Sequence, residues 1–165
     1  MCRHFLSISE NSSFLQNDVY TKLFTPSFAS FLPIEEHLKR IQLADLFLDT
    51  LPYNAHTTAS DALRVGLPVI TQIGESFVSR VVASLLNTVG LPELITATPK
   101  AYESLAIELA TNPEQLEKIK TKLVGNLSTS PLYNTKLFAH HIELAYQDMY
   151  KRYQDKLTPD HIYVL

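Results

Sequence analysis

The stretch DLFLDTLPYNAHTTASDALRVGLPVIT, residues 45–71, decides the fold. It opens with a short apolar run between Asp45 and Asp49, a pattern that is typical of a strand buried on both faces. A helical segment follows and ends at Gly66, and residues 67–71 form a second apolar run. Strand, helix and strand in this order predict a β-α-β unit with two parallel strands.

The segments on either side of this unit continue the alternation. Helices are expected at about 33–44 and 76–87, and a third short strand is expected at 93–96. Three more helices are expected at about 98–111, 113–125 and 134–152. The sequence therefore predicts an α/β fold, a partial Rossmann-like parallel sheet of the doubly wound kind with a helical C-terminal tail.

The chain divides into three parts of different character. Residues 1–30 show no sustained period of 2 or 3.6 and are expected to be irregular, with one or two short elements. Residues 31–152 are expected to form one lobe, and residues 153–165 are expected to form a loosely held tail. With 165 residues, of which 45% are hydrophobic, the chain can bury a core without disulfides.

Charge and cysteine content argue against several classes of protein. Lys and Arg number 14 and Asp and Glu number 17, so the formal net charge of -3 gives no basic excess for nucleic acid. The lone Cys2 cannot make a disulfide framework or a cysteine-rich zinc site. There is no run of about 18 apolar residues and no secretory core at the start. We expect a cytoplasmic protein with no nucleic-acid or membrane partner.

The loop between the first two predicted strands gives the strongest indication of a ligand. Residues 54–61, NAHTTASD, lead into a helix N-terminus, and their small side chains let a ligand approach the backbone. His56, Thr57 and Thr58 add donors for an anion such as phosphate, and Asp61 could accept hydrogen bonds from sugar hydroxyls. Thr57 or Thr58 is expected to cap this helix. The alternative to a ligand site is an ordinary capped helix with a surface histidine.

Two further segments could take part in the same site. Gly74 permits a tight turn before a helix that carries Arg80, although a capped helix with a solvated arginine is the plainer interpretation. His37 and Arg40 are three residues apart and are expected to share a helix face, where imidazole and guanidinium suit a planar base. A charged exterior face is the alternative for that pair.

Several of these segments, in this order, resemble one known family. They are residues 32–38 (LPIEEHL), 43–50 (LADLFLDT), 54–61 (NAHTTASD), 74–76 (GES), 79–81 (SRV), 83–84 (AS) and 130–135 (SPLYNT). The set resembles the C-terminal catalytic lobe of the protein O-linked N-acetylglucosamine transferase family, including its SPINDLY-like relatives. The resemblance covers about residues 31–152.

The resemblance implies a GT-B glycosyltransferase, in which two Rossmann-like lobes face each other across a cleft. A UDP-sugar is the implied donor, a Ser or Thr of a protein is the implied acceptor, and transfer inverts the anomeric carbon without a metal or other cofactor. Roles are implied for seven residues: backbone pairing with uracil near Leu32, base contacts from His37 and Arg40, diphosphate binding by His56, Thr57 and Thr58, and ribose binding by Asp61. His56 would also stabilise the leaving group.

Enzymes of this family carry tetratricopeptide repeats and a whole N-terminal lobe before this region. Their phosphate-binding lysine also lies upstream, where this sequence offers only Lys22 in different surroundings. We therefore expect the chain to be the donor-binding part of such a transferase. The alternatives are a UDP or UDP-sugar binding fragment that transfers nothing alone, and one half of a split enzyme that needs a partner chain. The sequence leaves the sugar and the acceptor proteins open.

Overall fold

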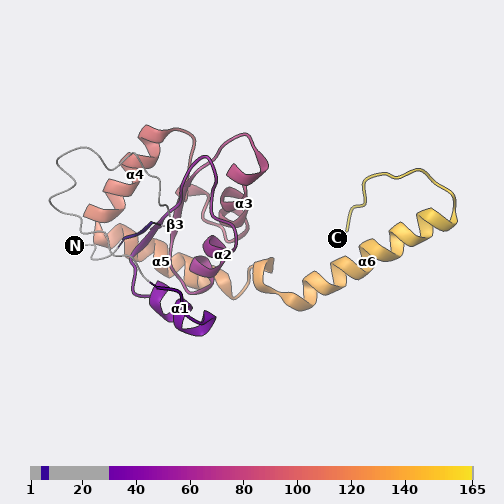
Figure 1. Ribbon diagram of the computed structural model, residues 1–165, viewed down its shortest axis with the longest axis horizontal. Coiled ribbons are helices and arrows are strands. Elements are labelled where there is room, and N and C mark those ends of the chain that lie inside the picture. Colours follow the sequence, from indigo (N-terminus) through magenta and orange to yellow (C-terminus); the bar gives the residue numbers. More distant parts are fainter. Residues whose placement is uncertain (1–4, 8–29, 165) are drawn as a thin grey trace.

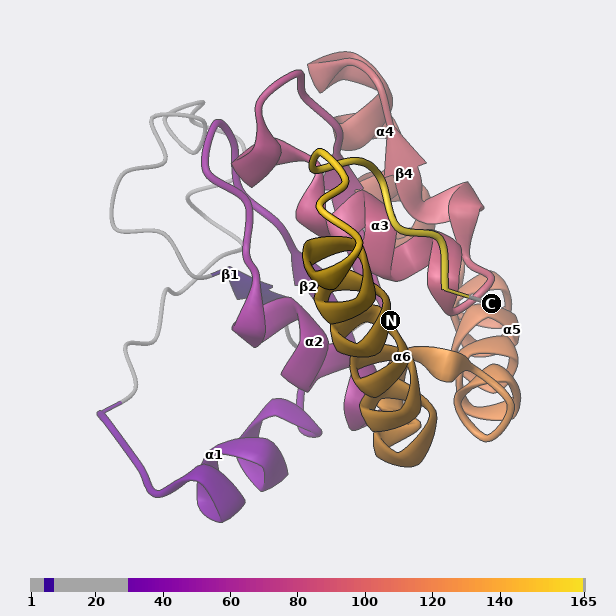
Figure 2. The ribbon, with the colours of Figure 1, turned by 90° about the vertical axis from the view of Figure 1, so that its right-hand side faces the viewer.

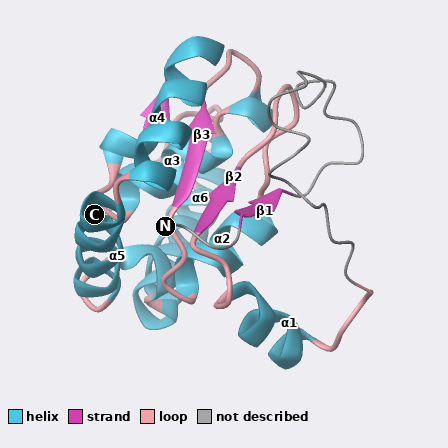
Figure 3. Cartoon of the chain, turned by 90° about the vertical axis from the view of Figure 1, so that its left-hand side faces the viewer, coloured by secondary structure: helices cyan, strands magenta, loops and turns pink. Residues whose placement is uncertain are grey.

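The computed structural model describes residues 5–7 and 30–164. Four parallel strands form one sheet in the order β1-β2-β3-β4 (Figure 3). The strands are β1 (Phe5–Ser7), β2 (Leu46–Leu48), β3 (Val69–Gln72) and β4 (Ile95–Thr96). The parallel α/β sheet predicted from the sequence is confirmed, and β1 is a short element in the segment that we expected to be irregular apart from one or two such elements.

Helices cover both faces of this sheet. In Figure 1, β3 lies between α4 on one side and α2 and α3 on the other. The helices are α1 (Ile34–Ile41), α2 (Thr57–Arg64), α3 (Val81–Thr88), α4 (Pro99–Thr111), α5 (Pro113–Leu127) and α6 (Thr135–Gln154). The layers arise because α2 and α3 connect successive parallel strands in the same direction, so both crossovers place their helix on one face.

The core lies between these layers and explains why the two apolar runs become strands. Leu46, Phe47, Val69 and Ile70 are at most 1% exposed, although successive side chains of a strand point to opposite faces. Both faces of the sheet are therefore buried, as parallel sheets require. On α2 the residues that face this core include two alanines, which let the helix approach the sheet closely; they are Ala59, Ala62 and Leu63.

Two element boundaries differ from the prediction. The helix expected at 76–87 is divided: Phe77–Ser79 form a short 3-10 turn, and α3 begins only at Val81. The Ser76 and Ser79 hydroxyls hydrogen-bond each other at 2.9 Å, and the Gly74 N–H donates to the Ser79 carbonyl at 3.0 Å. These local bonds compete with helix formation. Likewise, Pro92–Leu94 form a 3-10 turn, so the third expected strand shortens to β4.

The helix α6 leaves the body of the molecule, and the chain after it turns back alongside it (Figures 1 and 2). No residue of α6 is buried. The chain just before α6 is fixed to α2, because the Tyr133 hydroxyl donates to the Ser60 carbonyl at 2.7 Å. From the last turn of α6, Arg152 donates to the Thr158 carbonyl at 2.9 Å and lies 3.7 Å from a carboxylate oxygen of Asp160.

Candidate functional site

The carboxyl end of β2 opens onto a hollow of about 420 Å³. Its lining comes from the end of β2, the loop that follows and the first turn of α2, which are residues 47–50 and 53–58. Ligands of open parallel sheets bind outside the carboxyl ends of the strands, which is where this hollow lies. Three of the predicted site residues, His56, Thr57 and Thr58, line it together.

The start of α2 presents backbone donors at this hollow. His56 is the N-cap residue, and its carbonyl accepts from the Ser60 N–H at 3.1 Å. The N–H groups of Thr57 and Thr58 lie in the first turn of α2, where no earlier carbonyl of the helix is available to accept them. Together with the helix dipole, these N–H groups favour an anion. The prediction that a threonine caps α2 is wrong, because both threonines lie inside the helix, and the His56 side chain makes no capping bond.

The His56 ring contacts two aromatic side chains. The Tyr53 ring stacks on it with centroids 5.4 Å apart and an interplanar angle of 19°, and the Phe77 ring meets it edge-on at 6.1 Å. His56 Nε2 lies 3.4 Å from the Val78 carbonyl oxygen. Tyr53 and Phe77 belong to the loops that follow β2 and β3, so both loops determine where the imidazole lies.

Beneath the loop, three buried polar side chains hydrogen-bond one another. One carboxylate oxygen of Asp49 accepts from the Ala55 N–H at 2.7 Å, and the other accepts from the Thr71 hydroxyl at 2.6 Å. The Asn54 amide donates to Thr71 Oγ1 at 2.7 Å and to the Gln72 carbonyl at 3.1 Å. Asn54 and Ala55 are thus fastened to the ends of both central strands.

Burial controls the ionisation of this cluster. It raises the pKa of the Asp49 carboxyl, and the hydrogen bonds from Ala55 and Thr71 only partly offset that effect. Burial also raises the pKa of the Tyr102 hydroxyl far above its ordinary value, and the nearby Asp49 carboxylate raises it further. Tyr102 therefore stays protonated and donates to the Asp49 carbonyl at 2.8 Å, which joins α4 to the end of β2.

The predicted base-binding pair lies on α1, outside the lining of the hollow. His37 Nδ1 is 3.0 Å from an Arg40 nitrogen, and the other Arg40 terminal nitrogen donates to the Ser30 carbonyl at 2.8 Å. A guanidinium can only donate, so the imidazole accepts at Nδ1 and carries its proton on Nε2. The prediction that these two side chains share a face is confirmed.

The other two predicted residues also lie outside the hollow. Leu32 is half-buried just before α1, and Asp61 is half-buried on α2, beyond the first turn that lines the hollow. The structure therefore separates the predicted site residues into a group around the start of α2 and a group around α1. The two helices are in contact with each other.

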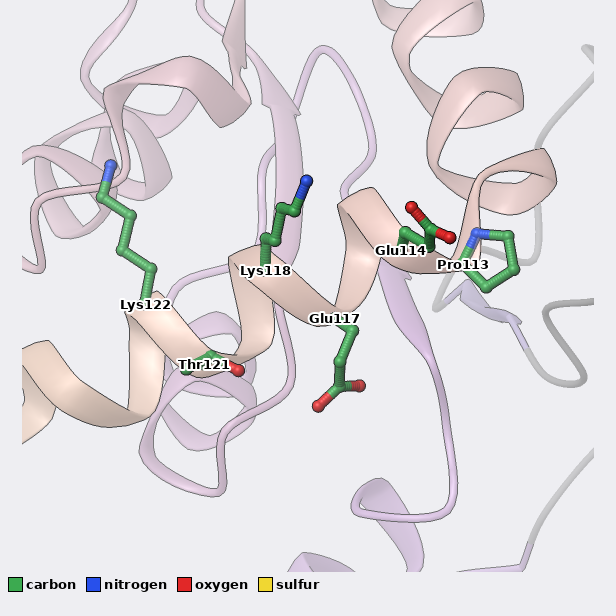
Figure 4. Close-up of a pocket in the computed structure, with 6 residues that line it drawn as sticks. All are labelled: Pro113, Glu114, Glu117, Lys118, Thr121 and Lys122. Atoms are coloured by element: carbon green, nitrogen blue, oxygen red, sulfur yellow. The ribbon is translucent and has the colours of Figure 1, made fainter.

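A larger depression on α5 is not a candidate site. Its volume is about 860 Å³, but all six lining residues come from this one helix. In Figure 4, Lys122 and Lys118 extend to the opposite side of the helix from Glu117. Such a surface has no second wall and no converging polar groups. The Lys122 ammonium is instead paired with Glu93 at 2.6 Å.

Sequence reasoning missed three polar residues of the cluster: Asp49, Asn54 and Thr71. Asp49 served only to mark the end of a strand, although an acidic residue that directly follows a buried strand is a usable indication of a site. Thr71 looked like a β-branched strand residue. Its contacts with Asp49 and Asn54 join residues 22 and 17 positions apart, which no local pattern reveals.

Among residues 5–7 and 30–164, no group of three or more His, Cys, Asp and Glu side chains could hold a metal ion. In the same part of the chain, every helix is too short or too polar to cross a bilayer.

The parallel sheet, the hollow at its carboxyl end and the helix start beside it define an α/β lobe of the Rossmann-like kind with a candidate ligand site. The profile of glycosyl transferase family 41 matches residues 20–142. The chain belongs to this family. The match includes the hollow and both groups of predicted site residues.

Named relatives agree with this assignment. The chain is 38% identical over 135 residues to the UDP-N-acetylglucosamine-peptide N-acetylglucosaminyltransferase of Caenorhabditis elegans, covering 82% of this chain and 12% of that protein. It is 32% identical over 162 residues to SPINDLY of Oryza sativa subsp. japonica, which is named as a probable transferase of the same kind. This match covers 96% of this chain and 17% of that protein. This chain thus spans less than a fifth of either relative.

A solved structure supports the fold. A mutant of the Thermobaculum terrenum O-GlcNAc transferase superposes with a TM-score of 0.68 and 32% sequence identity. The match covers 73% of this chain and 23% of that one. The fold is accordingly that of one lobe of a GT-B glycosyltransferase, as the family resemblance implied.

Proposed function

We propose that the chain is the donor-binding part of a protein O-glycosyltransferase, which moves N-acetylglucosamine from a UDP-sugar to a Ser or Thr of a protein. The observation that carries this proposal is the start of α2, where His56, Thr57 and Thr58 line one hollow at the carboxyl end of a parallel sheet. Family membership and the names of the relatives support the choice of sugar and acceptor.

In this proposal the diphosphate lies against the start of α2. Negative charge grows on it as the bond to the sugar breaks, and the N–H groups of Thr57 and Thr58, which have no acceptor within the helix, would donate to it. The helix dipole and a hydrogen bond from His56 add to that stabilisation. Preorganised donors of this kind stabilise the leaving group without a metal, so we propose a metal-independent transfer.

The remaining predicted residues would bind the nucleoside. The His37 ring would flank the uracil, with Arg40 at the edge of the base and the backbone near Leu32 paired to it. Asp61 would accept hydrogen bonds from the ribose hydroxyls. The support for this arrangement is that α1 contacts α2, so a base beside α1 and a diphosphate at the start of α2 can belong to one nucleotide.

The transfer we propose is a single displacement. The hydroxyl oxygen of the acceptor attacks the anomeric carbon from the face opposite the diphosphate. The new carbon–oxygen bond forms as the bond to the diphosphate breaks, the hydroxyl proton passes to a base, and the configuration inverts. The diphosphate leaves with the electron pair of the broken bond.

Calorimetry with UDP, UMP and GDP tests the donor site. We expect UDP to bind several-fold more tightly than UMP, because its second phosphate meets the start of α2. The variant His56→Ala should reduce that advantage, whereas His140→Ala on the exposed face of α6 should not. Equal affinities for UDP and UMP would contradict diphosphate binding at the start of α2. Equal affinities for UDP and GDP would contradict recognition of uracil.

A second candidate function is donor binding without transfer. The observation that favours it is that the hollow and all the predicted donor contacts lie within residues 32–61, in one lobe. On this proposal the 165 residues bind UDP-sugar and supply one wall of a cleft, and a partner lobe supplies the other. Transfer that appears only when the N-terminal lobe of a relative is added would support this candidate.

A further inference from the structure

The three buried polar side chains beneath the loop are more than the fold itself needs. Asp49 is 6% exposed, Asn54 is 1% exposed and Thr71 is fully buried. Asn54 Oδ1 is buried and accepts no hydrogen bond within residues 5–7 and 30–164. Apolar side chains of similar volume would fill such a space at no cost in unpaired polar groups. These polar residues therefore call for a role outside the packing of the core.

Their hydrogen bonds converge on the chain just before α2. Asp49 accepts from the N–H of Ala55, and Ala55 is followed directly by His56, the N-cap. Asn54 donates to the side chain of Thr71 and to the backbone of the next residue, Gln72. The conformation of the loop that presents His56 is consequently fixed from below by the ends of β2 and β3.

Asp49 is itself held from two sides. The Thr71 hydroxyl donates to its carboxylate at 2.6 Å, and the Tyr102 hydroxyl donates to its carbonyl at 2.8 Å from the helical layer on the other face of the sheet. Short bonds to a charged acceptor are stronger than bonds between neutral groups. The carboxylate is thus a rigid anchor for the Ala55 N–H.

We propose that Asp49 and Asn54 are positioning residues for the diphosphate, which hold residues 55–58 so that the first N–H groups of α2 and the His56 ring face the hollow. This inference rests on the proposed function, because it assigns those groups to a phosphate. The predicted base contacts, from His37 and Arg40, lie on α1 and share no hydrogen bond with this cluster among the described residues. Only the phosphate part of the affinity should depend on Asp49.

The experiment compares uridine with UDP by calorimetry on the full chain. In the wild type, the Thr71 hydroxyl donates to a carboxylate oxygen of Asp49 and accepts from the Asn54 amide. The variant Asp49→Asn puts an amide NH2 in place of that carboxylate oxygen, so the Thr71 hydroxyl loses its acceptor. We expect the ratio of UDP affinity to uridine affinity to fall about tenfold, since one charge-assisted bond is lost, while uridine binds as before. A residue with a merely structural role would change both affinities alike.

Two variants of one residue and a matched control complete the design. Thr71→Val removes the donor to Asp49 without changing charge and should lower the ratio by about threefold, whereas Thr71→Ser retains the hydroxyl and should keep the ratio. Thr96→Val is the control, because Thr96 is buried and donates at 2.9 Å to the Thr71 carbonyl, away from the loop. If circular dichroism shows that Asp49→Asn is unfolded, Thr71→Val decides.

The outcomes separate this inference from the proposed function. A wild-type chain that binds UDP no better than uridine would overturn the proposed function and this inference with it. A wild-type chain that prefers UDP, together with folded variants that keep the full ratio, would overturn the inference alone. The inference is likewise overturned if uridine and UDP weaken by the same factor.

Discussion

At the residue scale, the direction of one hydrogen bond determines what the α1 pair can offer. Arg40 donates to His37 Nδ1 and to the Ser30 carbonyl, so its donors are partly used within the chain. His37 Nδ1 is occupied by Arg40, which leaves Nε2 as the ring nitrogen that can meet a ligand. A half-exposed aromatic ring is suited to stacking on a base.

The first prediction concerns this ring. We expect His37→Ala to weaken UDP binding by about 1–2 kcal/mol, the scale of one lost stacking contact. The melting temperature should hardly change, because the side chain is not buried. Calorimetry and thermal unfolding measure the two effects, and His140→Ala provides the control. A large loss of melting temperature with unchanged UDP affinity would assign His37 to the fold instead.

The second prediction concerns the pH dependence of stability. Burial raises the pKa of Asp49, so the folded chain binds this proton more tightly than the unfolded chain does. The stabilising effect of the proton is fully present below the ordinary aspartate pKa of about 3.9 and is lost as the pH rises through the raised value.

Urea unfolding over a series of pH values measures this effect. The free energy of unfolding of the wild type, minus that of Asp49→Asn, should fall as the pH rises above about 4. Subtracting the variant cancels the other titrating groups, so the remaining pH dependence belongs to Asp49. A difference that grows with pH over the same range would contradict the assigned cause.

At the scale of elements, the turn after β3 depends on the lack of a side chain at Gly74. A Cβ atom there would collide with Ser79 Oγ and would lie 2.8 Å from Ser79 Cβ. Ser79 is 3% exposed and is bonded to Ser76, so it cannot easily move aside. Phe77 lies in this turn and its ring contacts the His56 ring. A change in the conformation of the turn would therefore alter the surroundings of His56.

The third prediction compares two glycines. We expect Gly74→Ala to reduce the free energy of unfolding by about 1–3 kcal/mol, the usual cost of overpacking. Gly125→Ala in α5 should instead raise it by about 0.5–1 kcal/mol, because a Cβ there meets nothing within 4 Å and alanine favours the helix. Denaturant unfolding measures both changes. Equal effects at the two positions would show that the turn tolerates a side chain.

The elements also show what the sequence can predict here. The run at 46–48 is apolar throughout and the run at 67–70 is apolar up to Thr71, so burial on both faces could be inferred and the parallel sheet followed. The division of the helix expected at 76–87 could not be inferred, because it depends on hydroxyl contacts that form only in the folded turn. The strand β1 has three residues, too few for a periodic pattern.

Of the candidate site, the part that depends on local sequence could be predicted, and the part that depends on contacts between strands could not. A strand followed by small polar residues and a helix indicates an anion site, which led to His56, Thr57 and Thr58 from local sequence alone. Asp49 and Asn54 required knowledge of which strands are neighbours. Their partners lie on β3, across the loop and the whole of α2.

At the scale of the whole molecule, the fourth prediction concerns catalysis. Proximity of donor and acceptor supplies on the order of 7–11 kcal/mol in favourable cases, and a two-lobed transferase obtains it by closing a cleft. The described residues supply one wall. We therefore expect the 165-residue chain to bind UDP but not to transfer sugar at a useful rate.

A radiolabelled UDP-N-acetylglucosamine assay with a broad peptide pool measures this rate, with His56→Ala as the comparison. Label on Ser or Thr that is lost in His56→Ala would show that this chain is competent alone. Label that appears equally with both proteins would indicate a contaminating transferase. The calorimetric measurements of UDP binding do not depend on that assay and would be unaffected.

The strands lie side by side in the sheet in the order in which they occur in the chain. During synthesis on the ribosome, each strand therefore emerges after the neighbour to which it will pair. No strand of the described sheet has to insert between two that are already joined. The sheet can grow at one edge as translation proceeds, and its short last strand, β4, needs only β3 as a template.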